Sequence, residues 1–329
     1  MNVLVYDAHS YDHQFLDVAN RGRHQLEYTT SQLDLQTAAL AQGHEAVCCF
    51  VNDDASAPVL ERLAGLGVRC LVLRCTGFNN VDLEAAKRLG IVVMRVAHYS
   101  PYAVAEHAVA LLQTLNRRTH RAYNRTREFN FRLGGLLGRD IHGSTVGVVG
   151  TGKIGVAFAS IMRGFGCTLL GYDAAENPAC LALGMIYKPL EELLPAADIV
   201  SLHVPLLPAT RHLINRKTLD LMKPGAFLIN TSRGGLVDTE AVIEALRQER
   251  LGGVGLDVYE EEDGLFFQDL SDRMVGDDVL ARLMMFPNVL VTGHQAFFTQ
   301  EAVTTIAETT LQNLDDFAAG RANDNVLTK

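Results

Sequence analysis

The stretch Val146-Gly-Val-Val-Gly-Thr-Gly-Lys-Ile-Gly155 decides the fold of this chain of 329 residues. Its apolar run is typical of a buried strand and continues directly into Gly150, Gly152 and Gly155, which have GxGxxG spacing. In a dinucleotide site, such glycines allow a tight strand-to-helix turn, close approach of the backbone to a pyrophosphate, and close packing of helix on strand. The helix N-terminus then faces the phosphate charge. The stretch therefore predicts a dinucleotide site, and the alternative is an ordinary glycine turn of an α/β protein.

A second apolar run, Thr168-Leu-Leu-Gly-Tyr-Asp173, ends in an acid 18 residues beyond Gly155. An acid at this distance is suited to bind a ribose 2′-hydroxyl. The 2′-phosphate of NADP would be repelled by Asp173, and no arginine follows immediately. The sequence therefore favours NAD over NADP as the cofactor.

The composition is that of a globular protein, because 48% of the residues are hydrophobic and 20% are charged. The length suffices for two domains with cores of their own. A net charge of −9 argues against a nucleic-acid-binding protein. One stretch is nevertheless basic, and we interpret it as a solvated helix face or an interface with acidic surface of a partner subunit. It contains Arg117, Arg118, His120, Arg121, Arg125, Arg127, Arg132 and Arg139.

The cysteines and the apolar runs bear on the cellular compartment. The six cysteines form no CxxC pair, so neither a disulfide framework nor a metal site is predicted. The N-terminus enters a strand pattern without the features of a signal peptide. No apolar run reaches transmembrane length. These features predict a reduced, cytoplasmic protein that does not bind membranes.

The chain alternates predicted strands and helices in two blocks. In the first block, helical runs at 58–67 and 82–90, each closed by a glycine, separate the predicted strands Val3–Tyr6, Ala46–Val51, Cys70–Arg74 and Ile91–Val96. Ser100-Pro101 then predicts a helix start, and the helical pattern continues to about Arg127. A helix of this length is suited to bridge domains or to pair with a neighbouring subunit. The second block has apolar runs at 145–149, 168–172, 198–202, 226–229, 253–256 and 288–291, which predict a doubly wound parallel sheet.

Each of the six runs in the second block ends in a glycine or a polar group. The ends are Gly150, Asp173, His203, Asn230-Thr-Ser-Arg233, Asp257 and Thr292-Gly-His294. Ligands of open α/β sheets bind at the carboxyl edge of the sheet, where these ends meet. We therefore expect a ligand site that contains a cation, several carboxylates and an imidazole.

Three side chains of this edge are suited to hydride transfer with NAD. A carbonyl that accepts a hydride also needs a proton, and His294 is the natural donor. Glu262 is the candidate carboxylate that holds its second ring nitrogen. Arg233 offers a planar fork for a substrate carboxylate. The alternatives are a structural histidine, an arginine helix cap, and a solvated acidic run at 260–262.

The motifs of the chain resemble those of the D-isomer-specific 2-hydroxyacid dehydrogenases. The resemblance covers nearly the whole chain, with these segments carrying it: 147–155, 203–210, 230–238, 255–262 and 288–297 in the second block, and 50–54, 73–82 and 99–107 in the first. It implies a Rossmann-type NAD-binding domain at 100–298 and a smaller, discontinuous, flavodoxin-like α/β substrate domain at 1–99 and 299–329. Residues 301–315 return as an amphipathic helix to the first block, and hinges are expected near 99–101 and 297–299.

The resemblance also implies roles for individual residues. Arg233 binds substrate, His294 is the acid and base, and Glu262 is its partner, since the family's glutamate stands five residues after Asp257; Glu260 becomes structural. The implied substrate-binding residues are Thr76 and Gly77, through their N–H groups, with Tyr99 and Phe297 lining the pocket. We assign to the cofactor Gly150, Gly152, Lys153, Ile154, Gly155, Asp173, His203, Val204, Pro205, Thr231, Ser232 and Asp257, the last near the nicotinamide amide.

Departures from the general family pattern favour one substrate. Asp263 replaces the usual proline after the glutamate, Thr292-Gly-His294 replaces the usual TPH triplet, and a long segment follows at 264–286. These features resemble the D-lactate dehydrogenase subgroup and imply reduction of pyruvate to D-lactate. The alternatives are a larger 2-oxo acid such as hydroxypyruvate or phenylpyruvate, or an NAD(H)-sensing corepressor with the same fold. A homodimer or homotetramer is expected.

Overall fold

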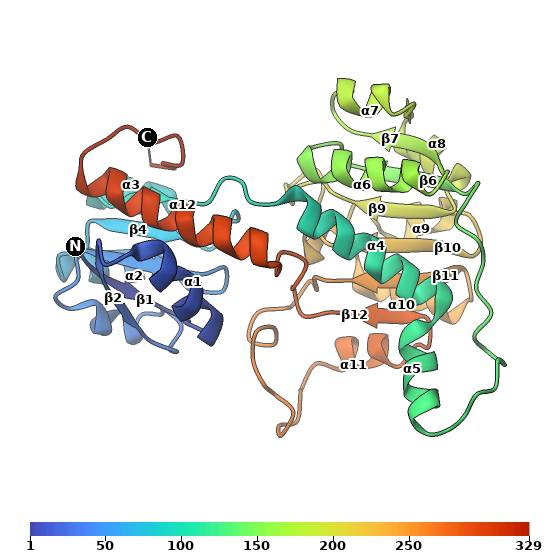
Figure 1. The fold of residues 1–329 in the computed structure, drawn as a ribbon, viewed down its shortest axis with the longest axis horizontal. Helices are drawn as coiled ribbons and strands as arrows, with labels where there is room; N and C mark the ends of the chain where they lie inside the picture. Colours follow the sequence, from blue (N-terminus) through green and yellow to red (C-terminus); the bar gives the residue numbers. More distant parts are fainter. Residues whose placement is uncertain (329) are drawn as a thin grey trace. The chain divides into compact units, whose positions relative to one another are not determined.

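A computed structural model describes residues 1–328 of the chain. The residues separate into two compact units (Figure 1). The first unit is Met1–Ser100 together with the segment that starts at Phe298, and the second unit is Pro101–Phe297. The chain therefore leaves the first unit once and returns to it once.

The first unit is built on a five-stranded parallel sheet of order β2-β1-β3-β4-β5. Its strands are β1 (Asn2–Val5), β2 (Gln25–Tyr28), β3 (Ala46–Cys49), β4 (Cys70–Leu73) and β5 (Val92–Met94). The sequence predicts all of these except β2. This edge strand, Gln-Leu-Glu-Tyr, has no fully buried residue, so it lacks the apolar run that marks a central strand.

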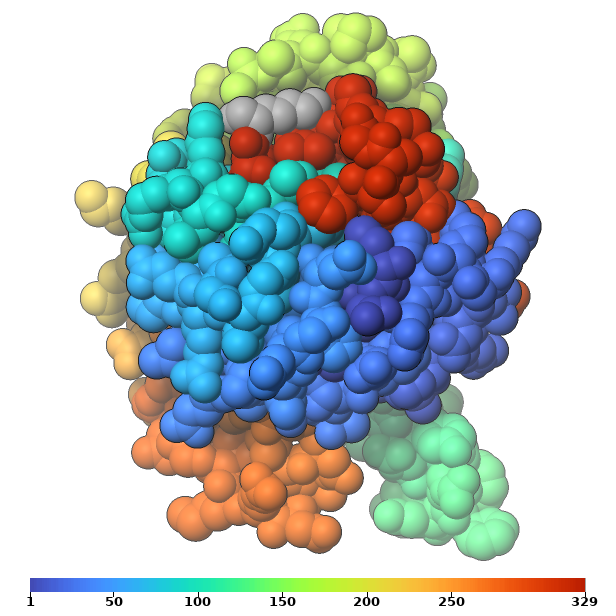
Figure 2. Space-filling view, turned by 90° about the vertical axis from the view of Figure 1, so that its left-hand side faces the viewer, coloured from blue at the N-terminus to red at the C-terminus, as the bar shows by residue number. Residues whose placement is uncertain are grey.

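Helices cover both faces of this sheet because successive residues of each strand point to opposite faces. Leu4 and Tyr6 pack toward α2 (Ala57–Gly65) and α3 (Leu83–Leu89), while Val3 and Val5 pack toward α1 (Ser10–Asn20) and α12 (Gln300–Ala318). A 3₁₀ helix, η1, spans Thr37–Ala41. The returning helix α12, drawn in red, lies beside the blue N-terminal residues on one surface (Figure 2).

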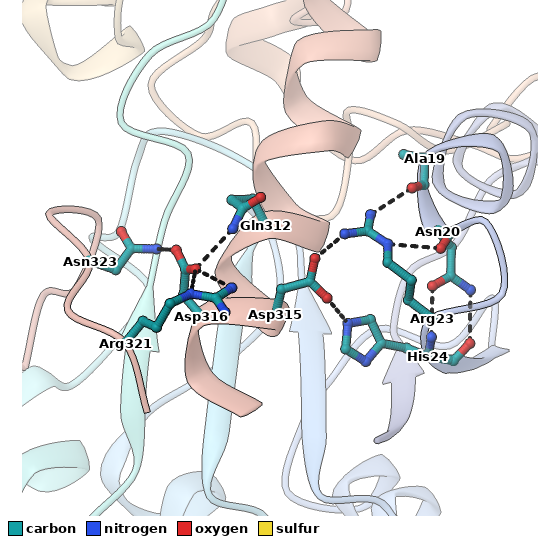
Figure 3. Close-up of polar contacts among 9 residues, drawn as sticks. All are labelled: Ala19, Asn20, Arg23, His24, Gln312, Asp315, Asp316, Arg321 and Asn323. Atoms are coloured by element: carbon teal, nitrogen blue, oxygen red, sulfur yellow. Dashed lines mark hydrogen bonds and ion pairs between the residues drawn. The ribbon is translucent and has the colours of Figure 1, made fainter. Parts of the chain in front are cut away.

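Two neighbouring carboxylates on α12 fix the returning segment to the first unit (Figure 3). Asp315 accepts from His24 Nε2 at 2.9 Å and forms an ion pair with Arg23, which also donates to the carbonyls of Ala19 and Asn20 at the end of α1. Asp316 accepts from Gln312, Arg321 and Asn323, which closes the turn after α12. The two ends of the chain thus form one unit.

The second unit holds a seven-stranded parallel sheet of order β12-β11-β10-β9-β6-β7-β8. Its strands are β6 (Thr145–Val149), β7 (Thr168–Tyr172), β8 (Ile186–Tyr187), β9 (Ile199–Leu202), β10 (Ala226–Asn230), β11 (Leu251–Leu256) and β12 (Val289–Val291). The six predicted strands are confirmed, and β8 is a short additional edge strand. The order of strands reverses beside β6, so the predicted doubly wound α/β fold is confirmed.

Helices cover both faces of this second sheet. Val148 and Phe158 belong to the core under α4 (Pro101–Arg117) and α6 (Lys153–Gly164). The opposite core, which contains Val149, lies under α8 (Leu190–Ala196), α9 (Arg216–Leu221) and α10 (Thr239–Arg247). The remaining short elements are α5 (Thr119–Arg127), α7 (Pro178–Ala182), η2 (Gly234–Leu236) and α11 (Asp278–Met284).

The single long helix predicted from Ser100 to about Arg127 is wrong. Arg118 adopts a left-handed conformation, with φ of 51°, and separates α4 from α5. The reason is packing: the buried face of α4 ends near Leu115, whereas α5 buries none of its residues. The charged residues of α5 have no apolar core beneath them that would keep them in line with α4.

Candidate active site

The glycine turn between β6 and α6 forms the first part of the site. Gly150 has φ of +97°, and a side chain there would collide with the backbone of His203. A Cβ at Gly155 would collide with the carbonyl of Gly150, so the helix packs directly on the turn. Gly152 caps α6 at its N-terminus, and a Cβ there would meet nothing within 4 Å. Two glycines are therefore required by packing, and the third leaves room for a pyrophosphate before Lys153 and Ile154.

Asp173 lies at the end of β7, beside the same turn. Its carboxylate accepts from the backbone N–H of Thr151 at 2.6 Å, the Thr151 hydroxyl at 3.0 Å, and the N–H of Ala174 at 2.7 Å. The hydroxyl of Tyr187 in turn donates to Thr151 Oγ at 2.9 Å. Asp173 is thus fixed against the glycine turn, where the first ribose of a dinucleotide follows the pyrophosphate. Thr151 stands inside the glycine motif, and this contact was missed by sequence reasoning.

Two buried polar atoms at the next strand ends have no protein partner. Burial lowers the pKa of His203 to about 3, so the ring is neutral near neutral pH. Its Nε2 lies 2.9 Å from Ser201 Oγ, and its buried Nδ1 has no hydrogen-bond partner. Thr231 Oγ is also buried without a partner, whereas Ser232 Oγ donates to the carbonyl of Leu202 at 2.8 Å. Unpaired buried polar groups at a sheet edge fit a polar ligand such as NAD.

Val204 and Pro205 follow His203 directly on the loop after β9. Val204 belongs to the turn contact, since its backbone N lies 2.7 Å from the position of a Cβ on Gly150. These two predicted cofactor residues therefore lie at the same edge as the glycine turn.

His294 and Glu262 form a hydrogen-bonded pair. The His294 Nδ1 lies 2.8 Å from Glu262 Oε1, and Glu262 Oε2 accepts from the backbone N–H of Tyr259 at 3.0 Å. The side chains of His294 and Glu262 are 16% and 14% exposed, so the pair is shielded but reachable. Within residues 1–328, no protein group hydrogen-bonds to His294 Nε2. The carboxylate fixes the ring through Nδ1 and leaves Nε2 open to a ligand.

The turn that carries His294 is held by Asp257, at the end of β11. His294 has φ of 53°, and its backbone N–H donates to the carbonyl of Asp257 at 2.7 Å. The Asp257 carboxylate is 0% exposed and accepts from the N–H groups of Gln295 at 2.9 Å and Ala296 at 2.7 Å. The Thr292 hydroxyl also donates to it, at 2.5 Å. The structure therefore shows Asp257 fixing the turn, and its contact with the nicotinamide amide stays a prediction.

Arg233 lies in the loop after β10 and is half-buried. The next residue, Gly234, has no room for a side chain because a Cβ would collide with the backbone of Tyr259. The loop of Arg233 thereby packs against the segment that leads to Glu262. Within the described residues, Arg233 forms no ion pair and donates only to the carbonyl of Ser232, at 2.6 Å. Its positive charge is thus not neutralised by a carboxylate of the same chain.

Glu260 has a different environment from Glu262. It pairs with Arg211 at 3.1 Å and with the ring of His212. These contacts join the loop after β9 to the segment after β11. The carboxylate of Glu260 thus has a structural role, while that of Glu262 serves His294.

The predicted substrate residues Thr76 and Gly77 follow β4 in the first unit. The Thr76 hydroxyl donates to the carbonyl of Val96 at 2.9 Å, and Arg95 Nη1 donates to the Thr76 carbonyl at 3.1 Å. Within residues 1–328, neither the Thr76 nor the Gly77 backbone N–H donates a hydrogen bond. Tyr99 and Phe297 lie beside the two crossings between the units, at Ser100 and Phe298.

Neither a metal site nor a membrane-spanning helix is found in the described part of the chain. No group of three or more histidine, cysteine, aspartate or glutamate side chains is placed to hold a metal ion there. Nor does any of its helices combine the length and the apolarity that crossing a membrane requires.

Together, the doubly wound sheet, the glycine turn and the histidine–glutamate pair define a nicotinamide-dependent oxidoreductase. Residues 108–296 match the family described as D-isomer specific 2-hydroxyacid dehydrogenase, NAD binding domain. The chain belongs to this family, and NAD is its cofactor.

Similar proteins match over nearly the whole chain. D-lactate dehydrogenase of Escherichia coli is 51% identical over 328 residues, covering 99% of this chain and 100% of that protein. 2-Hydroxyacid dehydrogenase A of Aspergillus oryzae is 54% identical over 333 residues, covering 100% and 96%. The apo structure of the Escherichia coli enzyme has a TM-score of 0.92 at 49% identity, covering 99% and 100% of the two chains. D-lactate dehydrogenase from Aquifex aeolicus, solved with NAD and lactic acid, has a TM-score of 0.88 at 31% identity, covering 100% and 99%.

Proposed function

We propose that the protein is an NAD-dependent D-lactate dehydrogenase, which reversibly reduces pyruvate to D-lactate. The observation that carries the proposal is the pair of His294 and Glu262, 2.8 Å apart, on the sheet edge that also carries the glycine turn. The names of the Escherichia coli and Aquifex aeolicus relatives support lactate as the product.

In the proposed reaction, NADH, when bound at the glycine turn, would supply a hydride for the keto carbon of pyruvate. Arg233 binds the substrate carboxylate, and its charge also polarises the adjacent carbonyl. The N–H groups of Thr76 and Gly77, which lack acceptors in the described residues, supply further donors to that carboxylate. His294 donates a proton from Nε2 to the carbonyl oxygen, and Glu262 stabilises the imidazolium before transfer.

The two units have separate roles in this proposal. The second unit binds NAD: Asp173 binds the ribose hydroxyls, the N-terminus of α6 faces the pyrophosphate, and Asp257 lies near the nicotinamide amide. The first unit is the substrate domain, and Tyr99 and Phe297 line the substrate pocket. Hinges near 99–101 and 297–299 let the domains close and exclude water during hydride transfer.

Steady-state oxidation of NADH with a panel of 2-oxo acids tests this function. We expect pyruvate to give the highest kcat/KM, with a turnover of about 1–10³ s⁻¹, and D-lactate as the product in chiral analysis. A higher kcat/KM for hydroxypyruvate or phenylpyruvate would show instead that the protein is a dehydrogenase for a larger D-2-hydroxy acid.

We also propose that the protein is a homodimer or homotetramer that assembles through an arm formed by α5 and residues 128–139. The arm carries large apolar side chains that are largely exposed: Phe129 is 84% exposed, Phe131 70%, Leu133 82% and Leu137 88%. It also carries arginines, in a chain whose net charge is −9, so an acidic surface of a second copy is a suitable partner. Light scattering tests this assembly, because Phe131→Asp with Leu137→Asp should reduce the mass to that of one chain.

A cytoplasmic location belongs to the same proposal. All six cysteines are free thiols, and all but Cys75 are buried. Reduced thiols are typical of proteins in a reducing compartment.

A further inference from the structure

One imidazole outside the proposed catalytic residues contacts the turn that carries His294. His107, on helix α4, has its Nε2 3.1 Å from Thr292 Oγ and 3.3 Å from Asp257 Oδ1. Its side chain is 17% exposed. His107 therefore joins a helix on one face of the sheet to the ends of β11 and β12.

The hydrogen bonds determine which atom carries the proton in this contact. The Thr292 hydroxyl has a single proton, and it is donated to the Asp257 carboxylate at 2.5 Å. The Thr292 oxygen can then only accept from His107, so His107 Nε2 carries a proton. The same N–H faces the carboxylate of Asp257, to which it is attracted.

Asp257 needs these donors because it is fully buried. Taking a carboxylate out of water is costly unless hydrogen bonds replace the lost solvent. The Asp257 carboxylate receives the Thr292 hydroxyl and the N–H groups of Gln295 and Ala296, while its backbone carbonyl holds His294. A shift of this carboxylate therefore moves the residues on both sides of His294.

The helix that carries His107 is well suited to fix a position. Ala108, Leu111 and Leu112 of α4 are buried in the core between α4 and the sheet. His107 thus projects from an element that is itself fixed by packing, whereas the turn around His294 has left-handed backbone and short bonds to one carboxylate.

We propose that His107 is a positioning residue, which fixes the Thr292–Asp257 pair and, through it, the turn that places His294 for proton transfer. The inference rests on the proposed function for its effect on turnover. The inference assigns a role to the contact of α4 with Thr292 and Asp257, the residues that hold the turn of His294.

The test compares two replacements of His107. Leucine removes the N–H, whereas glutamine retains an N–H near the position of Nε2. We expect His107→Leu to lower kcat for pyruvate reduction by about 10- to 100-fold, because small misplacements of a catalytic group have effects of this size. The protein should stay folded, and the lower kcat should persist at saturating NADH and pyruvate, so that weaker binding of the cofactor does not account for the loss. His107→Gln should restore most of the loss, and His142→Leu, an exposed imidazole elsewhere in the unit, is the matched control.

A second variant tests the route of the effect. Thr292→Val keeps the shape of the side chain and removes the hydroxyl between His107 and Asp257. If the two residues act through one contact, the double variant His107→Leu/Thr292→Val should lose little more than the worse single variant. The inference would be overturned if the losses of the two single variants multiplied in the double variant. It would also be overturned if His107→Leu and His107→Gln lost equal activity, or if His107→Leu kept full activity.

Amide hydrogen exchange provides a readout that does not depend on turnover. The N–H groups of Gln295 and Ala296 should exchange faster in His107→Leu than in the unmodified protein, and at nearly the original rate in His107→Gln. Unchanged exchange in His107→Leu would overturn the inference even if the protein reduces no 2-oxo acid. Absent turnover in the unmodified protein would instead overturn the proposed function alone.

Discussion

The carboxyl edges of the two parallel sheets differ in how they use charge. In the first unit, the edge holds Arg74, which is 2% exposed and donates to Asp12 Oδ1 at 3.0 Å and to the carbonyl of Asp7 at 2.6 Å. Asp53, 0% exposed, accepts from the N–H groups of Leu33 and Phe50. Both charges are bonded mainly within the unit, although Arg74 Nη1 is buried without a hydrogen-bond partner and, in the described residues, the N–H groups of Thr76 and Gly77 at the same edge have no acceptor.

The corresponding edge of the second unit leaves reactive atoms without protein partners. Within the described residues, His294 Nε2 has no hydrogen bond and Arg233 has no ion pair, while Thr231 Oγ is buried and unpaired. Ligands bind at this edge in open α/β sheets. The first edge thus uses its charged side chains mainly for stability, whereas the second edge leaves its charged side chains available for chemistry, and the following changes should separate the two uses.

The largest effect is expected at His294. His294→Ala should lower pyruvate reduction by about 10²- to 10⁴-fold, the usual contribution of a general acid, with little change in the free energy of unfolding. The control is His212→Ala, which removes another imidazole paired with a glutamate, Glu260, outside the proposed reaction. Near-normal turnover of the His294→Ala variant would show that His294 is not the proton donor.

Replacement of Arg74 should lower stability and leave cofactor binding unchanged, in contrast to replacement of His294. Arg74→Met leaves Asp12 buried without its charged partner, which should lower the free energy of unfolding by roughly 3–5 kcal/mol. The NADH affinity of the folded protein should be unchanged. Urea denaturation measures the loss, and the double variant Arg74→Met/Asp12→Leu should recover much of it. An Arg74→Met protein as stable as the unmodified one would contradict a structural role.

A smaller effect is expected at Asp173. Asp173→Ala removes charged hydrogen bonds worth about 1.5–3 kcal/mol each, so NADH affinity should fall by about tenfold or more. The preference for NADH over NADPH should narrow because the repulsion of a 2′-phosphate is lost. Fluorescence titration with both cofactors measures the ratio, with the exposed acid Glu176 replaced by alanine as control. An unchanged ratio would count against the ribose role.

The smallest effect is expected for the dependence of stability on pH. A buried group at each edge contributes to it, and the two contributions have opposite signs and partly cancel. Burial lowers the pKa of His203 in the second unit from 6.5 to about 3, so acidification below about pH 6.5 protonates the unfolded chain first and favours unfolding. Burial raises the pKa of Asp53 in the first unit from 3.8 to about 6, so the folded protein takes up that proton first and is stabilised by acidification in this range.

Urea denaturation at about pH 7 and about pH 5 separates these two contributions. His203→Gln should lose less stability on acidification than the unmodified protein, and Asp53→Asn should lose more. Equal pH dependence of all three proteins would show that neither group titrates as its burial requires.

Most of the fold could be predicted from the sequence because buried parallel strands are continuous apolar runs. The runs at 145–149 and 168–172 coincide with β6 and β7. The edge strands β2 and β8 were missed, since strands of a few half-exposed residues lack such runs. The break at Arg118 was missed because local helical pattern says nothing of where the core beneath a helix ends.

The site was predictable where one residue type is demanded by chemistry or by space. Gly150 and Gly155 stand where a side chain would collide with backbone, and the sequence predicts Glu262 and His294 as a pair, which is hydrogen-bonded in the structure. The contact of His107 with Asp257 was not predictable, because it joins residues 150 positions apart that no local pattern relates. The roles of the substrate-binding residues stay predictions.

Reduction of pyruvate with NADH that carries deuterium at both C4 positions of the nicotinamide, in ordinary water, tests the central claim most directly. If the second unit delivers a hydride from NADH while His294 supplies a solvent-derived proton to oxygen, the lactate should have the D configuration and carry deuterium at C2, one for each NADH oxidised. Lactate with hydrogen from water at C2, the L enantiomer, or NADH oxidation without lactate would contradict the account.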